Sequence, residues 1–353
     1  MISRDTIDRI FEAARIEEII KDFVDLKKAG VNYKGLSPFT DEKTPSFVVS
    51  PSKRIWKDFS SGKGGNVVSF LMEYDGCSYP DALRYIAEKY NIEIVEEELT
   101  DKQIQQKSVK DKLYEATLFA EKYFQDILWN TNEGKNIGLS YFKERGYNEE
   151  IIKKFKLGYS PKSANVFEKA AVKAGFNKKT LFDASLVGEN NTGKSYDKFK
   201  ERLIFPIYSY SGQVIGFGGR SFNVNAKSKY LNSAESLIYD KSKVLYGLNF
   251  AKQDISKQNN CYVVEGYTDV ISMHQIGINN IVSASGTALS KNQILLIKRL
   301  TKNITLLFDN DKAGISATIR SIDLCLQLEM NVKVCLFPKG EDPDSFSKKN
   351  SSE

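Results

Sequence analysis

Histidine is almost absent from this sequence, which contains a single one, His274. A site built from two histidines, or a histidine-rich metal site, is therefore excluded. A Ser-His-Asp mechanism would depend on that one residue. Because His274 falls within a helical pattern that follows an apolar strand, we expect it to be packed and not catalytic.

Cysteine and long apolar runs are also scarce. The four cysteines are scattered without a C-x2-C pair, which excludes a zinc knuckle and is typical of reduced cytosolic thiols. No apolar run approaches 18 residues, and residues 1–11 alternate charged and apolar side chains where a signal peptide would be continuously apolar. We therefore expect a cytoplasmic protein that does not enter a membrane.

The charge of the chain is small in total and uneven in placement. The 353 residues carry a formal net charge of +6 and have room for two or three domains. Residues 151–250 contain 17 Lys and Arg against 7 Asp and Glu. Such a basic region could hold a polyanion such as single-stranded nucleic acid.

Three regions differ in their hydrophobic patterns. Residues 1–95 combine helical spacing near 7–23, after Gly65 and after Pro80 with a short strand at 46–50. Residues 96–112 are polar and predict a linker or an exposed helix, and a further helix is expected over 113–128. Residues 202–220 hold two apolar runs around a Ser-Gly turn, which indicates a hairpin.

The last region alternates strand and helix patterns. Strands are expected at 262–265, 280–285, 304–309 and 332–338, with helices between them. That order predicts a parallel sheet covered on both faces. The expected fold class is thus a multidomain α+β and α/β protein: a small module of sheet and helices, a mixed α+β basic subdomain, and a parallel α/β sheet.

Acidic residues follow the predicted parallel strands. Sites in open parallel sheets form at the carboxyl ends of the strands, where these side chains would meet. Clustered carboxylates are costly unless cations neutralise them, and Mg²⁺ prefers oxygen ligands. The alternative is that the acids cap helices and are solvated. The candidate metal ligands are Glu265, Asp269, Asp309, Asp311, Asp342 and Asp344.

Residues 188–195, GENNTGKS, fit the pattern of a phosphate-binding P-loop. A P-loop requires a buried strand before it and a helix after it. Here the preceding apolar stretch is very short, and the charged residues YDKFKER follow. Two Asn and two Gly in eight residues favour a hairpin loop instead.

Several blocks of sequence resemble a known family. The segments VEGYTDV (264–270), LFDNDKAG (307–314) and GEDPD (340–344) resemble the metal-binding blocks of the TOPRIM domain of bacterial primases, topoisomerases and some nucleases. The segments YDKFKER (196–202), FPI (205–207), GFGGR (216–220), KYLNS (229–233) and LYGL (245–248) resemble the polymerase domain of the DnaG-type bacterial primase. The resemblance spans residues 1 to about 345 in the family's order.

The resemblance implies a template-directed nucleotidyltransferase. A 3′-hydroxyl would attack the α-phosphate of a ribonucleoside triphosphate on a single-stranded DNA template, yielding an RNA primer, with two or more Mg²⁺ or Mn²⁺ ions. Glu265, Asp309 and Asp311 would hold the principal ions, with Asp269, Asp342 and Asp344 completing the site. Another TOPRIM enzyme, a topoisomerase or nuclease, and a non-catalytic single-strand-binding remnant are the alternatives.

The same resemblance implies a set of cations for template and nucleotide. Each lies within a family block, although solvated surface charge is the alternative for any one of them. The predicted nucleic-acid and nucleotide contacts are Arg145, Lys198, Lys200, Arg202, Arg220, Lys229 and Lys241.

The N-terminal module resembles the primase zinc-binding domain except at its ligands. Where the family has cysteines and a histidine, this sequence has Ser37, Thr40, Asp58 and Ser61. Hydroxyls and one carboxylate are poor zinc ligands, so no zinc is expected. We expect a hydrogen-bonded Asp58 to replace the ion, above a small core of Phe39, Phe47, Trp56 and Phe59. Trp56 could instead contact single-stranded template.

The resemblance also implies domain boundaries. The expected parts are a template-binding module (1–95), a linker (96–112), a basic polymerase subdomain (113–257), a TOPRIM domain (258–345) and a tail (346–353). The family's helicase-binding domain has no counterpart in this sequence, so contact with a replicative helicase is expected to be weak or absent.

Overall fold

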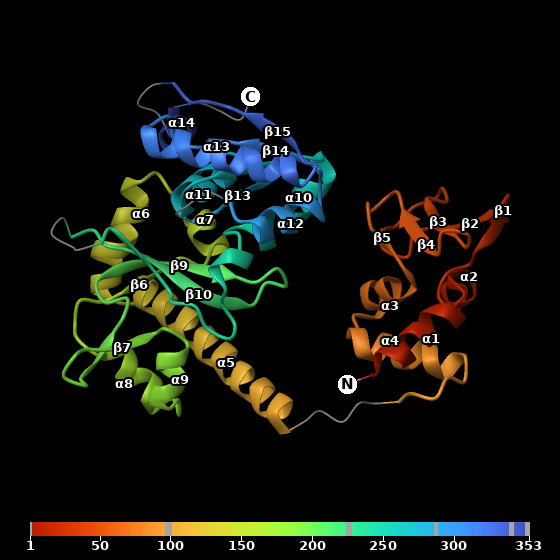
Figure 1. Cartoon of the computed structure of the whole chain (residues 1–353), viewed down its shortest axis with the longest axis horizontal. Helices are drawn as coiled ribbons and strands as arrows, with labels where there is room; N and C mark the ends of the chain where they lie inside the picture. The colour runs from red at the N-terminus through yellow and green to blue at the C-terminus, as the bar shows by residue number, and fades with distance from the viewer. Residues whose placement is uncertain (1, 96–100, 224–227, 286–288, 339–341, 350–353) are drawn as a thin grey trace. The chain divides into compact units, whose positions relative to one another are not determined.

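The computed structural model describes residues 2–95, 101–223, 228–285, 289–338 and 342–349, and the chain divides into two compact units, residues 1–105 and 106–353 (Figure 1). No helix among these residues is long and apolar enough to cross a bilayer. Each unit has its own buried core.

The first unit is a five-stranded antiparallel sheet with four helices. Helix α1 begins after Ser3, whose hydroxyl accepts the Thr6 amide hydrogen, and α3 begins after Asn66, whose side chain accepts that of Ser69. The strands pair in chain order. The elements are α1 (Arg4–Ala13), α2 (Ile16–Ile20), β1 (Lys27–Ala29), β2 (Asn32–Gly35), β3 (Phe47–Ser50), β4 (Ile55–Asp58), β5 (Gly64–Gly65), α3 (Val67–Asp75) and α4 (Tyr79–Lys89).

Aromatic side chains fill the core of this unit. Trp56 stacks on Phe47 with ring centroids 5.4 Å apart, and its indole N–H donates to the carbonyl of Asn66 at 2.9 Å. Trp56 is 1% exposed, so the structure supports its interpretation as a core residue. The prediction that Phe59 belongs to the core is wrong, because its side chain is 68% exposed. It follows β4, where the alternation of the strand no longer applies.

One long helix opens the second unit. Helix α5 (Asp101–Asn130) starts well before the expected Leu113, and residues 105–112 are exposed. Residues 96–100 of the predicted linker lie outside the described residues. A helix without an apolar face gives no periodic signal, which is why the sequence left a linker and an exposed helix as alternatives before residue 113; the helix is observed from Asp101.

A four-stranded antiparallel sheet follows α5, in the order β11-β10-β9-β6. The predicted hairpin is confirmed, since β9 and β10 pair from Val214–Tyr208 to Arg220–Leu203. Phe124 of α5 packs edge to face on Phe217 of β10, with centroids 5.6 Å apart. The elements are a π-helix (Gly134–Leu139), α6 (Ser140–Glu144), α7 (Glu149–Lys154), β6 (Gly158–Ser160), α8 (Val166–Lys173), α9 (Lys178–Asp183), β7 (Val187–Glu189), β8 (Ser195–Asp197), β9 (Arg202–Tyr208), β10 (Val214–Arg220) and β11 (Tyr230–Asn232).

The segment with the P-loop pattern is a hairpin turn. Strands β7 and β8 pair antiparallel, and the Asn190 side-chain oxygen accepts the amide hydrogens of Thr192 and Lys194 at 3.0 and 2.9 Å. Gly193 has φ +75°, which suits glycine. No helix follows Ser195, so this turn lacks the geometry of a P-loop.

The predicted parallel sheet is confirmed, with strand order β13-β12-β14-β15. Apolar residues of α10, α12 and α13 pack on one face, while α11 packs on the other with the antiparallel sheet. Figure 1 shows this sheet in blue and teal between its helices. The elements are a 3₁₀ turn (Lys241–Lys243), α10 (Leu248–Gln258), β12 (Cys261–Val264), α11 (Tyr267–Gln275), β13 (Ile281–Ser283), α12 (Lys291–Lys298), β14 (Asn303–Leu306), α13 (Lys312–Gln327), β15 (Asn331–Val334) and α14 (Pro343–Lys349).

The single histidine is packed, as expected. His274 on α11 is 5% exposed and lies edge to face against Phe155, with ring centroids 5.1 Å apart. Its Nδ1 lies 2.8 Å from the side-chain oxygen of Asn279. Burial lowers the pKa of His274 to about 4, and the nearby Lys154 charge acts in the same direction.

Candidate functional site

Two acids meet at the carboxyl edge of the parallel sheet. Glu265 follows β12 and Asp309 lies beyond β14, which pairs with β12. The Glu265 carboxylate accepts the backbone N–H of Asp309 at 3.1 Å. Burial raises the pKa of Glu265, and the neighbouring charges of Asp309 and Asp311 raise it further.

Asp311 and Gly314 shape the start of α13. Asp311 is the N-cap of this helix, and its carboxylate accepts the Gly314 amide hydrogen at 2.7 Å. A β-carbon at Gly314 would lie 2.1 Å from the Asp309 carbonyl oxygen and 2.9 Å from Oε1 of Glu265. Glycine is therefore required here for the helix to approach both acids.

Asp269 and Asp344 are the two most buried of the six predicted acids. Asp269 lies in the first turn of α11 and accepts the Gly266 amide hydrogen at 2.8 Å. Burial raises the pKa of Asp269 to about 8, and the charges of Asp309, Asp342 and Asp344 contribute. The pKa of Asp309 is raised by burial and by Asp342 and Asp311.

The last two predicted acids differ in their surroundings. Asp342 is exposed at the start of α14 and accepts the amide hydrogen of Ser345 at 2.6 Å. Asp344 is buried and pairs with Arg145 at 3.0 Å, and it also accepts the Ser272 hydroxyl hydrogen. Asp344 and Arg145 thus neutralise each other, and their predicted roles toward metal and template stay predictions.

The acidic edge suits hard cations chemically. Carboxylate oxygens gather there, and burial together with the neighbouring acids raises the pKa values of Glu265, Asp269 and Asp309. Within the described residues, no three His, Cys, Asp or Glu side chains already converge in ligating geometry. A divalent ion would supply the attraction that draws the carboxylates together.

Among the predicted cations, Arg220 is buried between two aromatic side chains. It is 8% exposed, and its guanidinium carbon lies 5.3 Å from the ring centre of Tyr141 and 5.4 Å from that of Tyr230. Among the described residues, no acceptor pairs with its N–H groups by hydrogen bond or ion pair. Its N–H donors are therefore available to bind an anion.

Other predicted cations have protein partners or lie in the open. Arg202 donates to the backbone carbonyls of Gly219 and Ser228 at 3.1 and 3.2 Å, so it supports the β10–β11 region. Lys200 and Lys229 are exposed. Lys241 is half-buried at the 3₁₀ turn, where its carbonyl accepts a side-chain amide hydrogen of Gln293.

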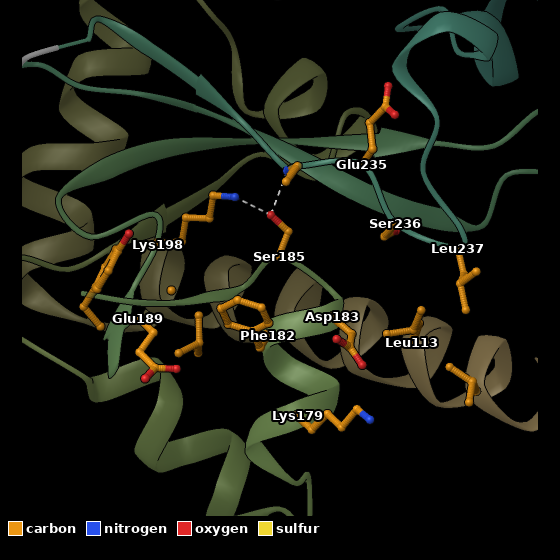
Figure 2. A pocket seen from close by; sticks show the side chains of 15 residues that line it. Leu113, Lys179, Phe182, Asp183, Ser185, Glu189, Lys198, Glu235, Ser236 and Leu237 are labelled. Carbon is orange, nitrogen blue, oxygen red and sulfur yellow. Dashed lines mark hydrogen bonds between the residues drawn. The ribbon is translucent and has the colours of Figure 1, made fainter. Parts of the chain in front are cut away.

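Lys198 lies in a separate cavity of about 720 Å³ (Figure 2). Its ammonium donates to the Ser185 hydroxyl oxygen, and burial lowers its pKa. The described lining of this cavity includes neither the six acids nor Arg220. The predicted contact of Lys198 with nucleic acid or nucleotide stays a prediction. Next to it in the sequence, Phe199 packs edge to face on Phe217, with ring centroids 6.0 Å apart.

Sequence reasoning missed Tyr141, Tyr230 and Gly314. An aromatic residue in a helical pattern is usually read as core, and the partners of Tyr141 are revealed only when α6 meets β10 and β11. For Gly314, a glycine three residues after the DxD segment was the available signal. Its reason, the approach to Glu265, is a contact across the sheet.

The residues that match the family's zinc-ligand positions take part in a hydrogen-bond network around one carboxylate. Asp58 is fully buried, and its oxygens lie 2.8 Å from the Ser37 hydroxyl and 3.0 and 3.1 Å from those of Ser60 and Ser46. The Ser61 hydroxyl and amide also donate to it. Burial opposes ionisation of Asp58, but these hydrogen bonds outweigh it and lower its pKa.

This donor set does not fit a zinc ion. The first unit contains no histidine and one cysteine, Cys77, in the α3–α4 connection. The predicted contact of Thr40 with Asp58 is indirect, since its hydroxyl meets that of Ser60. Ser46 and Ser60 were not predicted members of the network. Soft and borderline donors are lacking, so no role is derived for zinc.

The parallel sheet with its acidic edge defines a Toprim-type domain beside a basic antiparallel sheet. Residues 262–347 match the family described as Toprim-like, residues 123–252 match the DNA primase catalytic core N-terminal domain, and residues 2–102 match the CHC2 zinc finger. The structure is similar to the crystal structure of the Aquifex aeolicus primase zinc-binding and RNA polymerase domains, with TM-score 0.63, 32% identity, and coverage of 98% of this chain and 82% of that chain.

The chain belongs to the DnaG-type bacterial DNA primase family. It is 40% identical to the DNA primase of Clostridium acetobutylicum and 38% identical to that of Listeria monocytogenes, in each case over all of this chain. It covers 58% and 57% of those two proteins, somewhat over half of their length. A DnaG catalytic domain bound to single-stranded DNA is 34% identical, with TM-score 0.64 and coverage of 69% of this chain and 79% of that chain.

Proposed function

We propose that this protein is a DNA primase, which joins ribonucleotides into short RNA primers on a single-stranded DNA template in the cytoplasm. The observation that carries the proposal is the edge of the parallel sheet where Glu265 meets Asp309, in the same unit as Arg220, whose guanidinium lies over two tyrosine rings. Divalent cations and a polyanionic substrate would balance the two charges. Membership in the primase family supports the same reaction.

The acids would hold Mg²⁺ or Mn²⁺, the hard divalent ions that carboxylates prefer. Such ions supply the activation of the attacking 3′-hydroxyl and the stabilisation of the departing pyrophosphate. The residues of this chain supply position. The Asp309 amide fixes one oxygen of Glu265, and the first turn of α13 fixes Asp311. Asp269, Asp342 and Asp344 would complete the site.

The polyanions would contact the cations of the antiparallel sheet. Arg220 offers a planar set of N–H donors, which suits a phosphate group, while Lys200, Lys229 and Lys241 would contribute charge along the template. Arg202 and Arg145 would act by supporting these elements, since both have protein acceptors. The similar DnaG catalytic domain has been solved with single-stranded DNA bound to it, and this supports template binding by the present chain.

The test is ribonucleotide incorporation on single-stranded DNA with Mg²⁺. Asp309→Asn should lower the rate by about 10²-fold or more, since it removes charge from the acidic edge. Asp323→Asn, an exposed acid of α13, is the matched control and should keep the parent rate. Absence of product from the parent protein would refute the proposal and favour a binding remnant. Nicking or relaxation of plasmid DNA would favour another Toprim enzyme.

We further propose that the N-terminal module folds and binds template without zinc. The Asp58 network joins β4, the β2–β3 connection and the turn before β5, the segments that a zinc ion would cross-link. Metal analysis of purified protein should find less than about 0.1 zinc per chain, as expected for a donor set without thiolate or imidazole. Near-stoichiometric zinc would contradict this proposal.

A further inference from the structure

Cations and aromatic rings alternate beside the acidic edge. Arg145 lies over the ring of Tyr141 with its guanidinium carbon 5.8 Å from the centre, Arg220 lies 5.3 Å from the same ring, and Tyr230 follows at 5.4 Å from Arg220. We call Arg145, Tyr141, Arg220 and Tyr230 the arginine–tyrosine array. Its members come from helix α6 and its C-cap and from strands β10 and β11, so it joins a helix to a sheet.

Both ends of the array are fixed by the fold. Arg145 pairs with Asp344 at 3.0 Å, and Arg220 and Tyr230 are direct partners in the β10–β11 register. The ring of Tyr230 also lies 6.4 Å, centroid to centroid, from that of Tyr267, two residues before Asp269 on α11. The array therefore stands next to the acids where triphosphate chemistry is proposed.

Tyr141 occupies the central place between the two arginines. Its hydroxyl oxygen accepts the Nε hydrogen of Arg145 at 3.1 Å, while the guanidinium carbon of Arg220 lies over its ring, 5.3 Å from the centre. The same carbon lies over the ring of Tyr230 at 5.4 Å, and β10 fixes the backbone of Arg220. Cation–π contacts of this kind leave the N–H donors of a guanidinium available to a ligand.

We propose that Tyr141 is a positioning residue that holds the guanidinium of Arg220 edge-on for a phosphate group of the template or nucleotide. The proposal rests on the proposed function for the identity of the ligand. Stacking fixes the orientation without using the N–H donors, so the donors stay free for the phosphate. A carboxylate partner would hold Arg220 equally well but would compete with the phosphate and neutralise it.

The experiment compares Tyr141→Leu, Tyr141→Phe and Tyr210→Leu in the full chain. Tyr210 is the matched control, because its ring also lies under a cation, Lys252, at 4.9 Å, but at the turn between β9 and β10. Affinity for single-stranded DNA is measured by fluorescence anisotropy over a salt series, and KM and kcat are measured for ribonucleotide incorporation. Thermal unfolding establishes that each variant is folded.

Tyr141→Leu should weaken DNA binding or raise the nucleotide KM by about three- to tenfold, the loss expected for a desolvated cation–π contact, with a smaller change in kcat. Tyr141→Phe keeps the ring over Arg220 and should retain most of the affinity. Tyr210→Leu should match the parent. If a folded Tyr141→Leu binds and turns over like Tyr210→Leu, or if Tyr141→Phe loses as much as Tyr141→Leu, the proposal is overturned.

A double-mutant cycle links Tyr141 to Arg220. Arg220→Lys keeps the charge but loses the planar edge, so Tyr141→Leu added to it should cause little further loss. Full additivity of the two losses would contradict positioning. If the parent binds DNA but incorporates no ribonucleotide, the proposed function fails while the binding measurements still decide the role of Tyr141.

Discussion

At the scale of single residues, most side chains proposed to act at the site are held in position by an identifiable contact. The positions of all six acids could be predicted from strand ends and from the family resemblance. Their environments could not, since the partner of Asp344 is Arg145, far away in the sequence. Tyr141 and Gly314 were missed for the same reason: their roles depend on contacts across the fold and not on spacing along the chain.

Gly314→Ala should disable the acidic edge without a change in charge. The added methyl group would meet the Asp309 carbonyl and Glu265, and these acids must move to accept it. Because displacements of about 1 Å at catalytic groups cost ~10²-fold, we expect ribonucleotide incorporation to fall by about tenfold or more. Ser316→Ala, on the exposed side of the same helix, should leave the rate unchanged. A Gly314→Ala protein with parent activity would show that the contact is not required.

The Asp58 network should make the first unit sensitive to acid. The folded pKa of Asp58 is lowered, so its stabilising contribution is complete above the unfolded pKa of about 3.9 and is lost as the pH falls through the folded value. Asp58→Ala would leave buried hydroxyls without their acceptor and should cost about 1–3 kcal/mol at neutral pH. Urea unfolding monitored by tryptophan fluorescence measures both effects, since Trp56 lies in this core.

The exposed Asp41 provides the control for this measurement. Asp41→Asn should unfold like the parent at every pH, whereas Asp58→Asn should lose most of the acid-dependent component. Equal unfolding curves for Asp58→Asn and the parent between pH 3 and 7 would show that the carboxylate does not stabilise the module.

At the scale of helices and strands, apolar sequence patterns were sufficient to predict an element, and polar patterns were not. The β9–β10 hairpin and all four parallel strands were predicted from alternating or continuous apolar runs. For the first turns of α5, the sequence left a linker and an exposed helix as alternatives, because an exposed polar helix has no buried face to reveal it. The P-loop pattern at 188–195 illustrates the opposite case, in which letters match while the required helix does not form.

Lys194 should therefore be dispensable. In a P-loop this lysine would contact nucleotide phosphates, but here it closes a hairpin turn through its backbone and its side chain is exposed. Lys194→Ala should change the ribonucleotide KM and kcat by no more than about twofold, as is usual for an exposed surface substitution. A tenfold rise in KM would restore the phosphate-binding interpretation of this turn.

At the scale of the whole molecule, we expect the two units to differ in their dependence on metal ions. The second unit has an acidic edge that suits divalent cations, and the first unit has a network of hydroxyl donors around the Asp58 carboxylate, which we propose replaces a metal site. The family resemblance indicated where in the sequence both features lie. What it could not supply was the full membership of the network, since Ser46 and Ser60 matched no motif.

Removal of metal ions by a chelator should therefore affect activity but not the stability of the first unit. Excess EDTA should abolish ribonucleotide incorporation, because the carboxylates then lack the cations that balance them. The unfolding temperature of the first unit, followed by tryptophan fluorescence, should not move by more than about 1 °C, since no metal contributes binding free energy there. Added Mg²⁺ should restore incorporation. A fall of many degrees in the unfolding temperature would show a structural metal in the first unit.

The network around Asp58 has one further consequence, which concerns redox chemistry. Zinc held by thiolates is released when peroxides or electrophiles oxidise the sulfur. The oxygen atoms of Asp58, Ser37, Ser46, Ser60 and Ser61 offer no such target. This part of the protein should therefore keep its structure under oxidative stress, where a thiolate-bound module would lose its ion and unfold.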